Sequence, residues 1–247
     1  MPENRYEKQK DFWENAGNIG YNKAIYSDSK VANHIRLKHW DALIKFAQEL
    51  GLNNKSKILE LGCGDGYFAD KIISDLFGQI DSFDVSKAAI ERAKSNLTAT
   101  NINFYNEDIT VYDYKENDYW DGAFLVGFLH HVKPFVPEII SKLSKVAPSV
   151  VVLEPNGDNL IRKFLELTPS YQKAGEDSFK LQELTQIFEK NGYKLEYIKK
   201  LTFAPPFLPE SLLPIFKILE NIIEPNPCLN NLCSTYILGF RKETILL

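Results

Sequence analysis

Three glycines and two acidic residues stand close together near residue 60. The stretch ILELGCGDGYFAD (58–70) holds Gly62, Gly64 and Gly66 at alternate positions, with Glu60 before them and Asp65 between the last two. Glycine has no Cβ, so a glycine-rich turn allows a ligand to approach the backbone closely. An apolar run precedes the turn and a helical pattern follows it, which predicts a ligand-binding loop between a buried strand and a helix.

A dinucleotide and a cationic nucleoside are the two ligands that could bind such a turn. Dinucleotide sites have the pattern G-x-G-x-x-G, with the pyrophosphate at the helix N-terminus. Here the third glycine comes one residue early, and Tyr67 stands where the dinucleotide pattern has glycine. Asp65 also places a negative charge close to where the pyrophosphate would lie. The residues therefore favour a cationic or zwitterionic ligand, which is compatible with Asp65 and Glu60.

The sequence ILELGCGDG resembles motif I of the class I S-adenosylmethionine-dependent methyltransferases. The resemblance extends to Asp84, which closes the second predicted strand 18 residues after Gly66, and to NEDI (106–109) at the end of the third. It implies that Asp84 accepts hydrogen bonds from the ribose hydroxyls, and that Asp108 and Ile109 contact the adenine. Glu60 would orient the loop or reach the methionine ammonium through water, and Gly62 and Gly64 would make room for the methionine and ribose. The cofactor pocket predicted in this way contains Glu60, Gly62, Gly64, Gly66, Asp84, Val85, Asp108, Ile109 and Val126.

The fourth predicted strand ends in VGFLHHV (126–132), where the acceptor of the methyl group is expected. Many families that methylate amino or amide nitrogens carry Asn/Asp-Pro-Pro-Tyr/Phe here, and this chain does not. The segment is instead similar to that of small-molecule methyltransferases. His131 is a candidate general base, because the unperturbed pKa of histidine lies near neutrality. The alternative is that His130 and His131 only line the start of the following helix and hydrogen-bond to backbone.

We expect an enzyme that transfers a methyl group from S-adenosylmethionine to a small-molecule acceptor. An oxygen nucleophile is favoured, in a sugar or lipid of a cell-surface pathway. One alternative is an aminopropyl transferase on the same fold, although paired acidic residues for a polyamine are not found after the fourth strand. The other is a non-catalytic S-adenosylmethionine-binding partner subunit, against which the intact motif I and Asp84 argue.

The elements that must position these residues follow from the apolar pattern. Strands are predicted at 57–61, 80–85, 102–109, 121–126, 149–154, 193–203 and 234–242, and helices at 31–50, 67–77, 86–97 with Ser86 as N-cap, around 136–146, and 181–191. Apolar strands that alternate with helices predict an α/β fold, a Rossmann-like seven-stranded and mostly parallel sheet with helices on both faces. We expect one methyltransferase domain over 1–247, with an N-terminal helical cap (1–57) and a helical insertion (204–232). No helix is predicted between the third and fourth strands, because 110–120 is too polar and too short.

The insertion at 204–232 carries more apolar residues than one narrow helical stripe can hold. It could form a lid over the substrate, an oligomer face such as that of a homodimer, or a membrane-surface helix. Its polar side is predicted to hold Lys217, Glu210, Glu220 and Glu224. A single lysine gives little attraction to anionic lipid, which favours the lid or the homodimer.

The composition narrows the remaining classes. A chain of 247 residues with a formal net charge of -4 and a pI near 5.7 argues against a nucleic-acid partner. The three cysteines do not form a metal-binding pattern, so no metal is predicted and the thiols are expected to be reduced. No secretory signal or transmembrane run is recognised, and a cytoplasmic location is expected.

Overall fold

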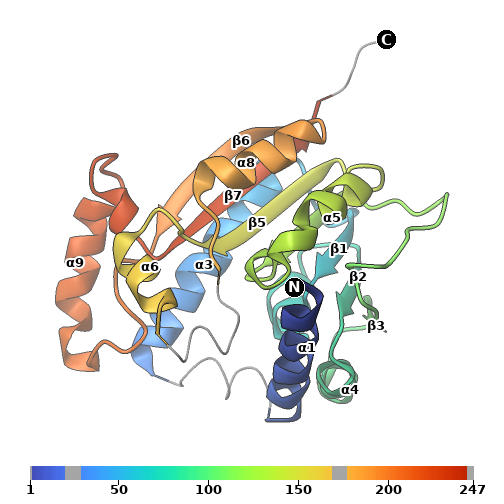
Figure 1. Ribbon diagram of the computed structural model, residues 1–247, viewed down its shortest axis with the longest axis horizontal. Helices are drawn as coiled ribbons and strands as arrows, with labels where there is room; N and C mark the ends of the chain where they lie inside the picture. The colour runs from blue at the N-terminus through green and yellow to red at the C-terminus, as the bar shows by residue number, and fades with distance from the viewer. Residues whose placement is uncertain (1, 20–28, 169–176, 244–247) are drawn as a thin grey trace.

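The computed structural model describes residues 2–19, 29–168 and 177–243, and in them seven strands form one sheet (Figure 1). The strand order is β3-β2-β1-β4-β5-β7-β6. The strands are β1 (Lys57–Leu61), β2 (Gln79–Asp84), β3 (Ile102–Asn106), β4 (Gly122–Val126), β5 (Ser149–Pro155), β6 (Tyr193–Leu201) and β7 (Thr235–Lys242). β1 to β5 pair in parallel, whereas β7 is antiparallel to both of its neighbours, β5 and β6. The predicted seven-stranded, mostly parallel sheet is confirmed.

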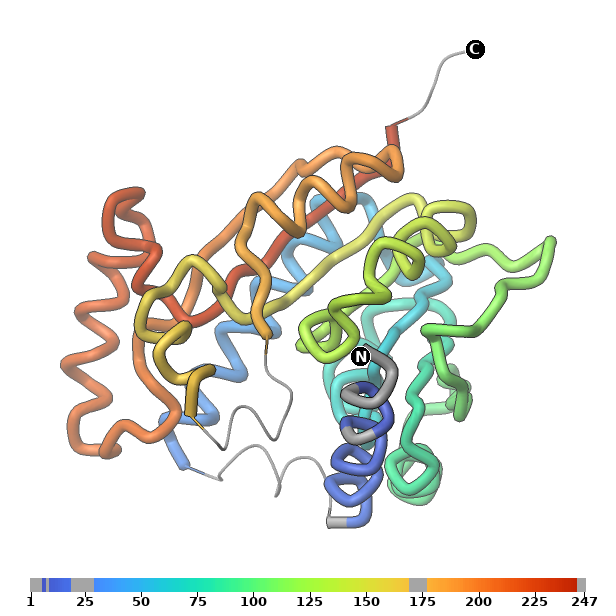
Figure 2. Tube along the Cα trace, in the orientation of Figure 1, coloured from blue at the N-terminus to red at the C-terminus, as the bar shows by residue number. Residues whose placement is uncertain are grey.

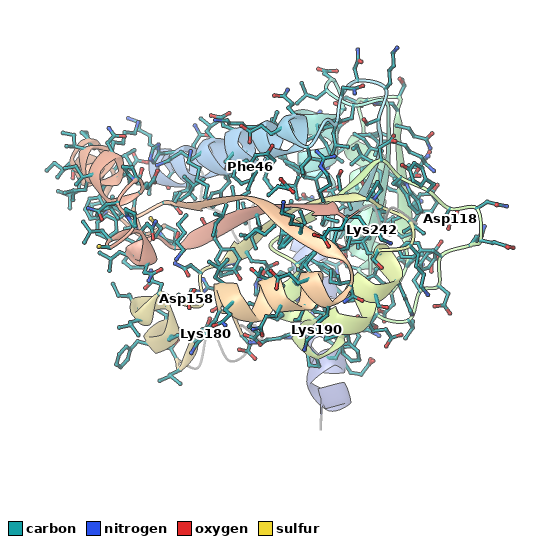
Figure 3. All side chains as sticks on the ribbon, turned by 90° about the horizontal axis from the view of Figure 1, so that it is seen from above. Phe46, Asp118, Asp158, Lys180, Lys190 and Lys242 are labelled. Atoms are coloured by element: carbon teal, nitrogen blue, oxygen red, sulfur yellow. The ribbon has the colours of Figure 1, made fainter. Side chains whose placement is uncertain are left out.

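Helices cover both faces of this sheet. They are α1 (Pro2–Ile19), α3 (Lys30–Glu49), α4 (Lys87–Asn96), α5 (Val136–Leu143), α6 (Leu160–Glu166), α8 (Leu181–Lys190) and α9 (Leu213–Ile223). Figure 3 shows α3, which carries Phe46, on one side of the strands and α8, between Lys180 and Lys190, on the other. None of the helices in the described ranges is both long and apolar enough to cross a lipid bilayer.

Two helical segments differ from the sequence prediction. The helix expected at 67–77 begins as predicted at residue 67, continues as a π-helical segment, Ala69–Ile73, and ends before its predicted C-terminus. α6 was not predicted, and it begins at an asparagine N-cap, Asn159, whose side chain accepts hydrogen bonds from two backbone N–H groups. Ser86 caps α4 as predicted, because its hydroxyl accepts a hydrogen bond from the N–H of Ala89.

The core lies in two layers, one on each face of the sheet. Successive strand residues point to opposite faces. In β1, Leu59 belongs to the cluster under α5 and α8, whereas Ile58 belongs to the cluster under α3. Both side chains are fully buried. The central strands are therefore held rigidly from both sides, which fixes the positions of the loops at their carboxyl ends.

α9 turns the side that carries Glu220 toward the rest of the protein. The Glu220 carboxylate is 1% exposed and accepts hydrogen bonds from Lys38 Nζ at 2.8 Å and from the N–H groups of Phe203 and Ala204 at 3.0 and 3.1 Å. His34 Nε2 lies 2.7 Å from it. The burial of an acid is tolerated here because each lone pair has a donor. The opposite side of α9 exposes Ile215, Ile218 and Ile222.

Candidate active site

The predicted site residues lie at the carboxyl ends of four neighbouring strands. β1 is flanked by β2 and β4, so the strand order reverses between β1 and β4. In open α/β sheets, ligands bind in the crevice at this point. The glycine loop follows β1, Asp84 ends β2, Asp108 stands two residues after β3, and Val126 ends β4. The fold therefore brings the predicted residues to one edge of the sheet.

Asp84 holds the glycine loop in place. Its Oδ2 accepts a hydrogen bond from the Gly64 N–H at 2.8 Å, and its Oδ1 accepts one from the Ser86 N–H at 2.9 Å. The N–H groups of Gly62 and Cys63 both donate to the carbonyl of Phe83, at 2.8 and 3.1 Å. A carboxylate oxygen can accept two hydrogen bonds. Each oxygen of Asp84 therefore retains the capacity to accept one more donor, as a ribose hydroxyl would require.

Two of the glycines are required by the protein's own packing. Gly62 has φ +76° and a Cβ there would lie 2.7 Å from the ring of Phe128. Gly66 has φ +74° and a Cβ there would lie 2.6 Å from the ring of Phe104. Gly62 is therefore needed for the packing of Phe128, and its expected part in making room for a ligand stays a prediction. Backbone contact of this loop with a ligand stays a prediction.

Buried carboxylates dominate the electrostatics at this edge of the sheet. Glu60 is 2% exposed and accepts a hydrogen bond from the Ser82 hydroxyl at 2.7 Å. Burial, together with the nearby charge of Asp84, raises the pKa of Glu60 to about 7. Burial, with the charges of Glu14 and Asp65, likewise raises the pKa of Asp84 to about 6.

A positive ligand would complete this group of charges. In the described ranges, no lysine or arginine forms an ion pair with Glu60, Asp65 or Asp84. An opposite charge nearby favours the ionised form of a carboxylate and offsets its desolvation. These carboxylates therefore favour a cationic ligand and disfavour a pyrophosphate.

α1 contributes residues to the site that the sequence did not indicate. Figure 2 shows α1 beside α4, close to the ends of the strands. The Tyr6 hydroxyl donates to Asp108 Oδ1 at 2.7 Å, and Lys10 Nζ lies 2.7 Å from Asp108 Oδ2. Glu14 accepts a hydrogen bond from the Ser86 hydroxyl at 2.7 Å. The four-residue spacing of Tyr6, Lys10 and Glu14 was the available signal, since it places all three on one side of a helix.

Asp108 is held in its ionised form. Burial tends to raise its pKa, but hydrogen bonds from Lys10, Thr110 and Tyr6 lower it below the usual value. Ile109 is buried in the core beneath it. Val85 and Val126 are both half-buried at the ends of β2 and β4.

His131 lies in a short 3-10 turn, Leu129–His131, after β4. Its ring centroid is 4.4 Å from the Trp13 ring of α1 and 3.8 Å from the His130 ring. Burial, then the electrostatic interactions with His130 and Arg162, lower the pKa of His131 well below its usual value. Its Nδ1 is buried and has no hydrogen-bond partner among the described residues. A neutral imidazole with an unpaired buried nitrogen can hydrogen-bond to a ligand.

The fold and this crevice define a class I S-adenosylmethionine-dependent methyltransferase. A family model described as "Methyltransferase domain" matches residues 32–198, so the chain belongs to the methyltransferase domain family. The family, the fold and the S-adenosylmethionine cofactor that the sequence predicted are confirmed.

Individual relatives agree with this class. The chain is 27% identical over 173 residues to a malonyl-[acyl-carrier protein] O-methyltransferase of Bacillus anthracis, which covers 69% of this chain and 62% of that protein. The chain therefore spans less than two thirds of the length of this relative. A magnesium protoporphyrin IX methyltransferase of Synechocystis with bound SAH superposes with a TM-score of 0.63 at 14% identity, covering 95% of this chain and 100% of that one. An S-adenosylmethionine-dependent methyltransferase from Mesorhizobium loti superposes with a TM-score of 0.59 at 16% identity, covering 82% and 97%.

Proposed function

We propose that this protein transfers the methyl group of S-adenosylmethionine to an oxygen atom of a small-molecule acceptor. The observation that carries the proposal is a pair of buried acids, Glu60 in β1 and Asp84 at the end of β2, for which the described part of the chain supplies no lysine or arginine as an ion-pair partner. S-adenosylmethionine supplies an activated methyl group on a positively charged sulfur and also carries an ammonium group. These charges are the complement of the crevice.

The residues that hold the cofactor are assigned by the resemblance and supported by their positions. Asp84 accepts from the ribose hydroxyls through the free capacity of its two oxygens. Asp108 and Ile109 lie at the adenine, with Val85 and Val126 as apolar neighbours. Gly62, Gly64 and Gly66 shape the loop, and Glu60 faces the positively charged end of the cofactor.

Oxygen is proposed as the acceptor atom for two reasons. The chain has His130 and His131 after β4, where many nitrogen-directed families have an Asn/Asp-Pro-Pro motif. The relative from Bacillus anthracis is an O-methyltransferase. Two classes of oxygen fit: the hydroxyl of a sugar or lipid, and the carboxylate of an acyl thioester.

His131 is proposed as the base when the acceptor is a hydroxyl. Nδ1 of His131 would accept the proton that the hydroxyl loses, and S-adenosylmethionine, when bound, would supply the activated methyl group. A carboxylate is already ionised at neutral pH and needs no base. The mutation His131→Ala should therefore slow methylation of a hydroxyl by ~10²-fold or more and leave methylation of a carboxylate nearly unchanged.

The test is turnover of S-adenosylmethionine with a panel of acceptors. The panel pairs malonyl-pantetheine with hydroxylated sugars and lipids, and formation of S-adenosylhomocysteine is measured for the wild type and for Asp84→Ala. We expect turnover with at least one oxygen acceptor, and a strong loss in Asp84→Ala. Formation of methylthioadenosine from decarboxylated S-adenosylmethionine would instead support aminopropyl transfer. Binding of S-adenosylmethionine without turnover on any oxygen or nitrogen acceptor would refute the proposal.

A further inference from the structure

Glu154 is a fully buried carboxylate at the end of β5, beside the turn that carries the two histidines. Its Oε1 accepts hydrogen bonds from the N–H groups of Phe128 and Leu129 at 2.9 and 2.7 Å. Its Oε2 accepts one from the N–H of His130 at 3.3 Å and lies 2.7 Å from the His130 ring nitrogen Nδ1. The side chain is 0% exposed.

These contacts determine which nitrogen of His130 carries a proton. Three of the four groups around Glu154 are backbone N–H donors, which favour the ionised carboxylate. An ionised carboxylate can only accept hydrogen bonds, so Nδ1 of His130 must be the donor. His130 is thereby held with its proton on Nδ1. A carboxylate that orients an imidazole in this way also stabilises a positive charge on that imidazole.

His131 is in turn fixed by His130 and by α1. Its ring contacts those of His130 and Trp13, at centroid distances of 3.8 and 4.4 Å. The backbone N–H of His131 donates to the carbonyl of Phe128, within the turn that Glu154 holds. The position of the unpaired Nδ1 of His131 therefore depends on Glu154, although these two residues are not in hydrogen-bond contact.

We propose that Glu154 is a positioning residue that sets the tautomer of His130 and presents Nδ1 of His131 to the acceptor. Its effect on catalysis rests on the proposed function, whereas its effect on His130 does not. In this proposal Glu154 contacts His130, His130 contacts His131, and His131 faces the acceptor hydroxyl. Loss of the carboxylate should misplace the base without disturbing Asp84 and the cofactor loop, which are held by separate contacts.

The first test measures the tautomer directly and needs no substrate. The chain has four histidines, so two-bond proton–nitrogen NMR spectra of the ¹⁵N-labelled protein can resolve each ring. The His130→Gln variant assigns the His130 signals by their disappearance. We expect His130 with the proton on Nδ1 in the wild type at pH 7, and a change of that signal in Glu154→Gln. An Nδ1 of His130 that carries no proton in the wild type at pH 7 would overturn the inference.

The second test measures catalysis with a hydroxyl acceptor found in the turnover assay. A displaced reacting group can cost up to ~10²-fold in rate. We expect Glu154→Gln to lower kcat by about 10- to 100-fold, with KM and cofactor affinity within about twofold of the wild type. Glu154→Asp should recover part of the loss. An unchanged kcat in a folded Glu154→Gln protein would overturn the positioning role.

A matched control separates positioning from general destabilisation. Asp81 is also a buried carboxylate in the sheet, 3% exposed, but it binds Trp120 and Asn103 away from the histidine turn. Asp81→Asn should lower thermal stability and leave kcat unchanged. If Asp81→Asn reduces kcat as much as Glu154→Gln does at equal loss of stability, the positioning role is wrong. If the wild type shows no turnover at all, the proposed function fails, while the NMR measurement still decides the tautomer.

Discussion

Binding of S-adenosylmethionine should release protons from Glu60 and Asp84 between pH 6 and pH 7. In the ligand-free protein, the pKa of Glu60 is about 7 and that of Asp84 about 6, chiefly because both are buried. A cationic ligand beside them favours the ionised forms and lowers both pKa values. The ammonium group of the ligand remains mostly protonated below pH 7, so it hardly contributes to the effect.

The size of the effect follows from the two pKa values. At pH 6, a group with a pKa of about 7 is about nine-tenths protonated and a group with a pKa of about 6 is half protonated. Complete ionisation on binding therefore releases between one and one and a half protons. If only the ionised pair binds, the association constant rises about tenfold from pH 6 to pH 7, which is about 1.4 kcal/mol.

Isothermal titration calorimetry in buffers of different ionisation enthalpy measures the released protons. The variant Glu60→Gln should reduce the release at pH 6 to about half a proton and the rise in affinity to about twofold, because only Asp84 then titrates. S-adenosylhomocysteine is a matched ligand without the sulfur charge and should release fewer protons. Equal heats in both buffers and a constant affinity from pH 6 to pH 7 would refute the electrostatic account of the crevice.

The same two acids should make the ligand-free protein less stable as the pH rises, whereas they make cofactor affinity rise with pH. Their folded pKa values lie above the unfolded values of 4.5 and 3.8, so the folded chain binds more protons than the unfolded chain between pH ~4 and pH ~7. The free energy of unfolding from these groups therefore falls as the pH rises through this range. Cofactor binding removes that loss, so its stabilising effect should be larger at pH 7 than at pH 6.

Three further predictions test single contacts. Asp84→Ala should lower S-adenosylmethionine affinity by about 10- to 100-fold, because hydrogen bonds to a charged group contribute about 1.5–3 kcal/mol. The chain should stay folded, as a melting curve will show. Calorimetry measures the affinity, and an unchanged value would remove the ribose assignment. Gly66→Ala should reduce the free energy of unfolding by about 2–5 kcal/mol. Gly127 has a similar φ but open space around it, so Gly127→Ala should reduce the free energy of unfolding by only about 1–2 kcal/mol. Equal losses in urea denaturation would show that packing at Gly66 does not matter. Tyr6→Phe removes one donor from Asp108 and should weaken the docking of α1 by about 1–2 kcal/mol, seen as faster amide hydrogen exchange in 2–19, and unchanged exchange would contradict this.

The sheet and the glycine loop after β1 could be predicted from sequence because their signals are local. Each strand is a short apolar run bounded by polar or turn residues, and all seven are found within two or three residues of their predicted bounds. The glycine spacing and Asp84 follow directly from the order of strand, loop and helix. Such features depend on neighbours in the chain, which the sequence displays.

The parts that could not be predicted depend on contacts between distant segments. Glu220 reads as a surface residue, but the fold brings Lys38 from α3 to its carboxylate, 182 residues away in the chain. Tyr6 meets Asp108 across 102 residues in the same way. A buried charge is stable only when its partners are present. Single-sequence patterns do not identify those partners, so the burial of Glu220 and the role of α1 could not be predicted.

We propose that Asp108 couples the N-terminal helix to the cofactor. Its Oδ1 accepts from Tyr6 and from Thr110, and its Oδ2 lies beside Lys10, so the remaining acceptor capacity is on Oδ2. An adenine amino group at the predicted position can therefore donate to Asp108 without displacing α1. Because α1 already orients the Asp108 carboxylate, less of the binding free energy is spent on ordering this side chain. Docking of α1 and binding of the cofactor then favour each other, and by linkage the affinity that α1 adds for the cofactor equals the stability that the cofactor adds to α1.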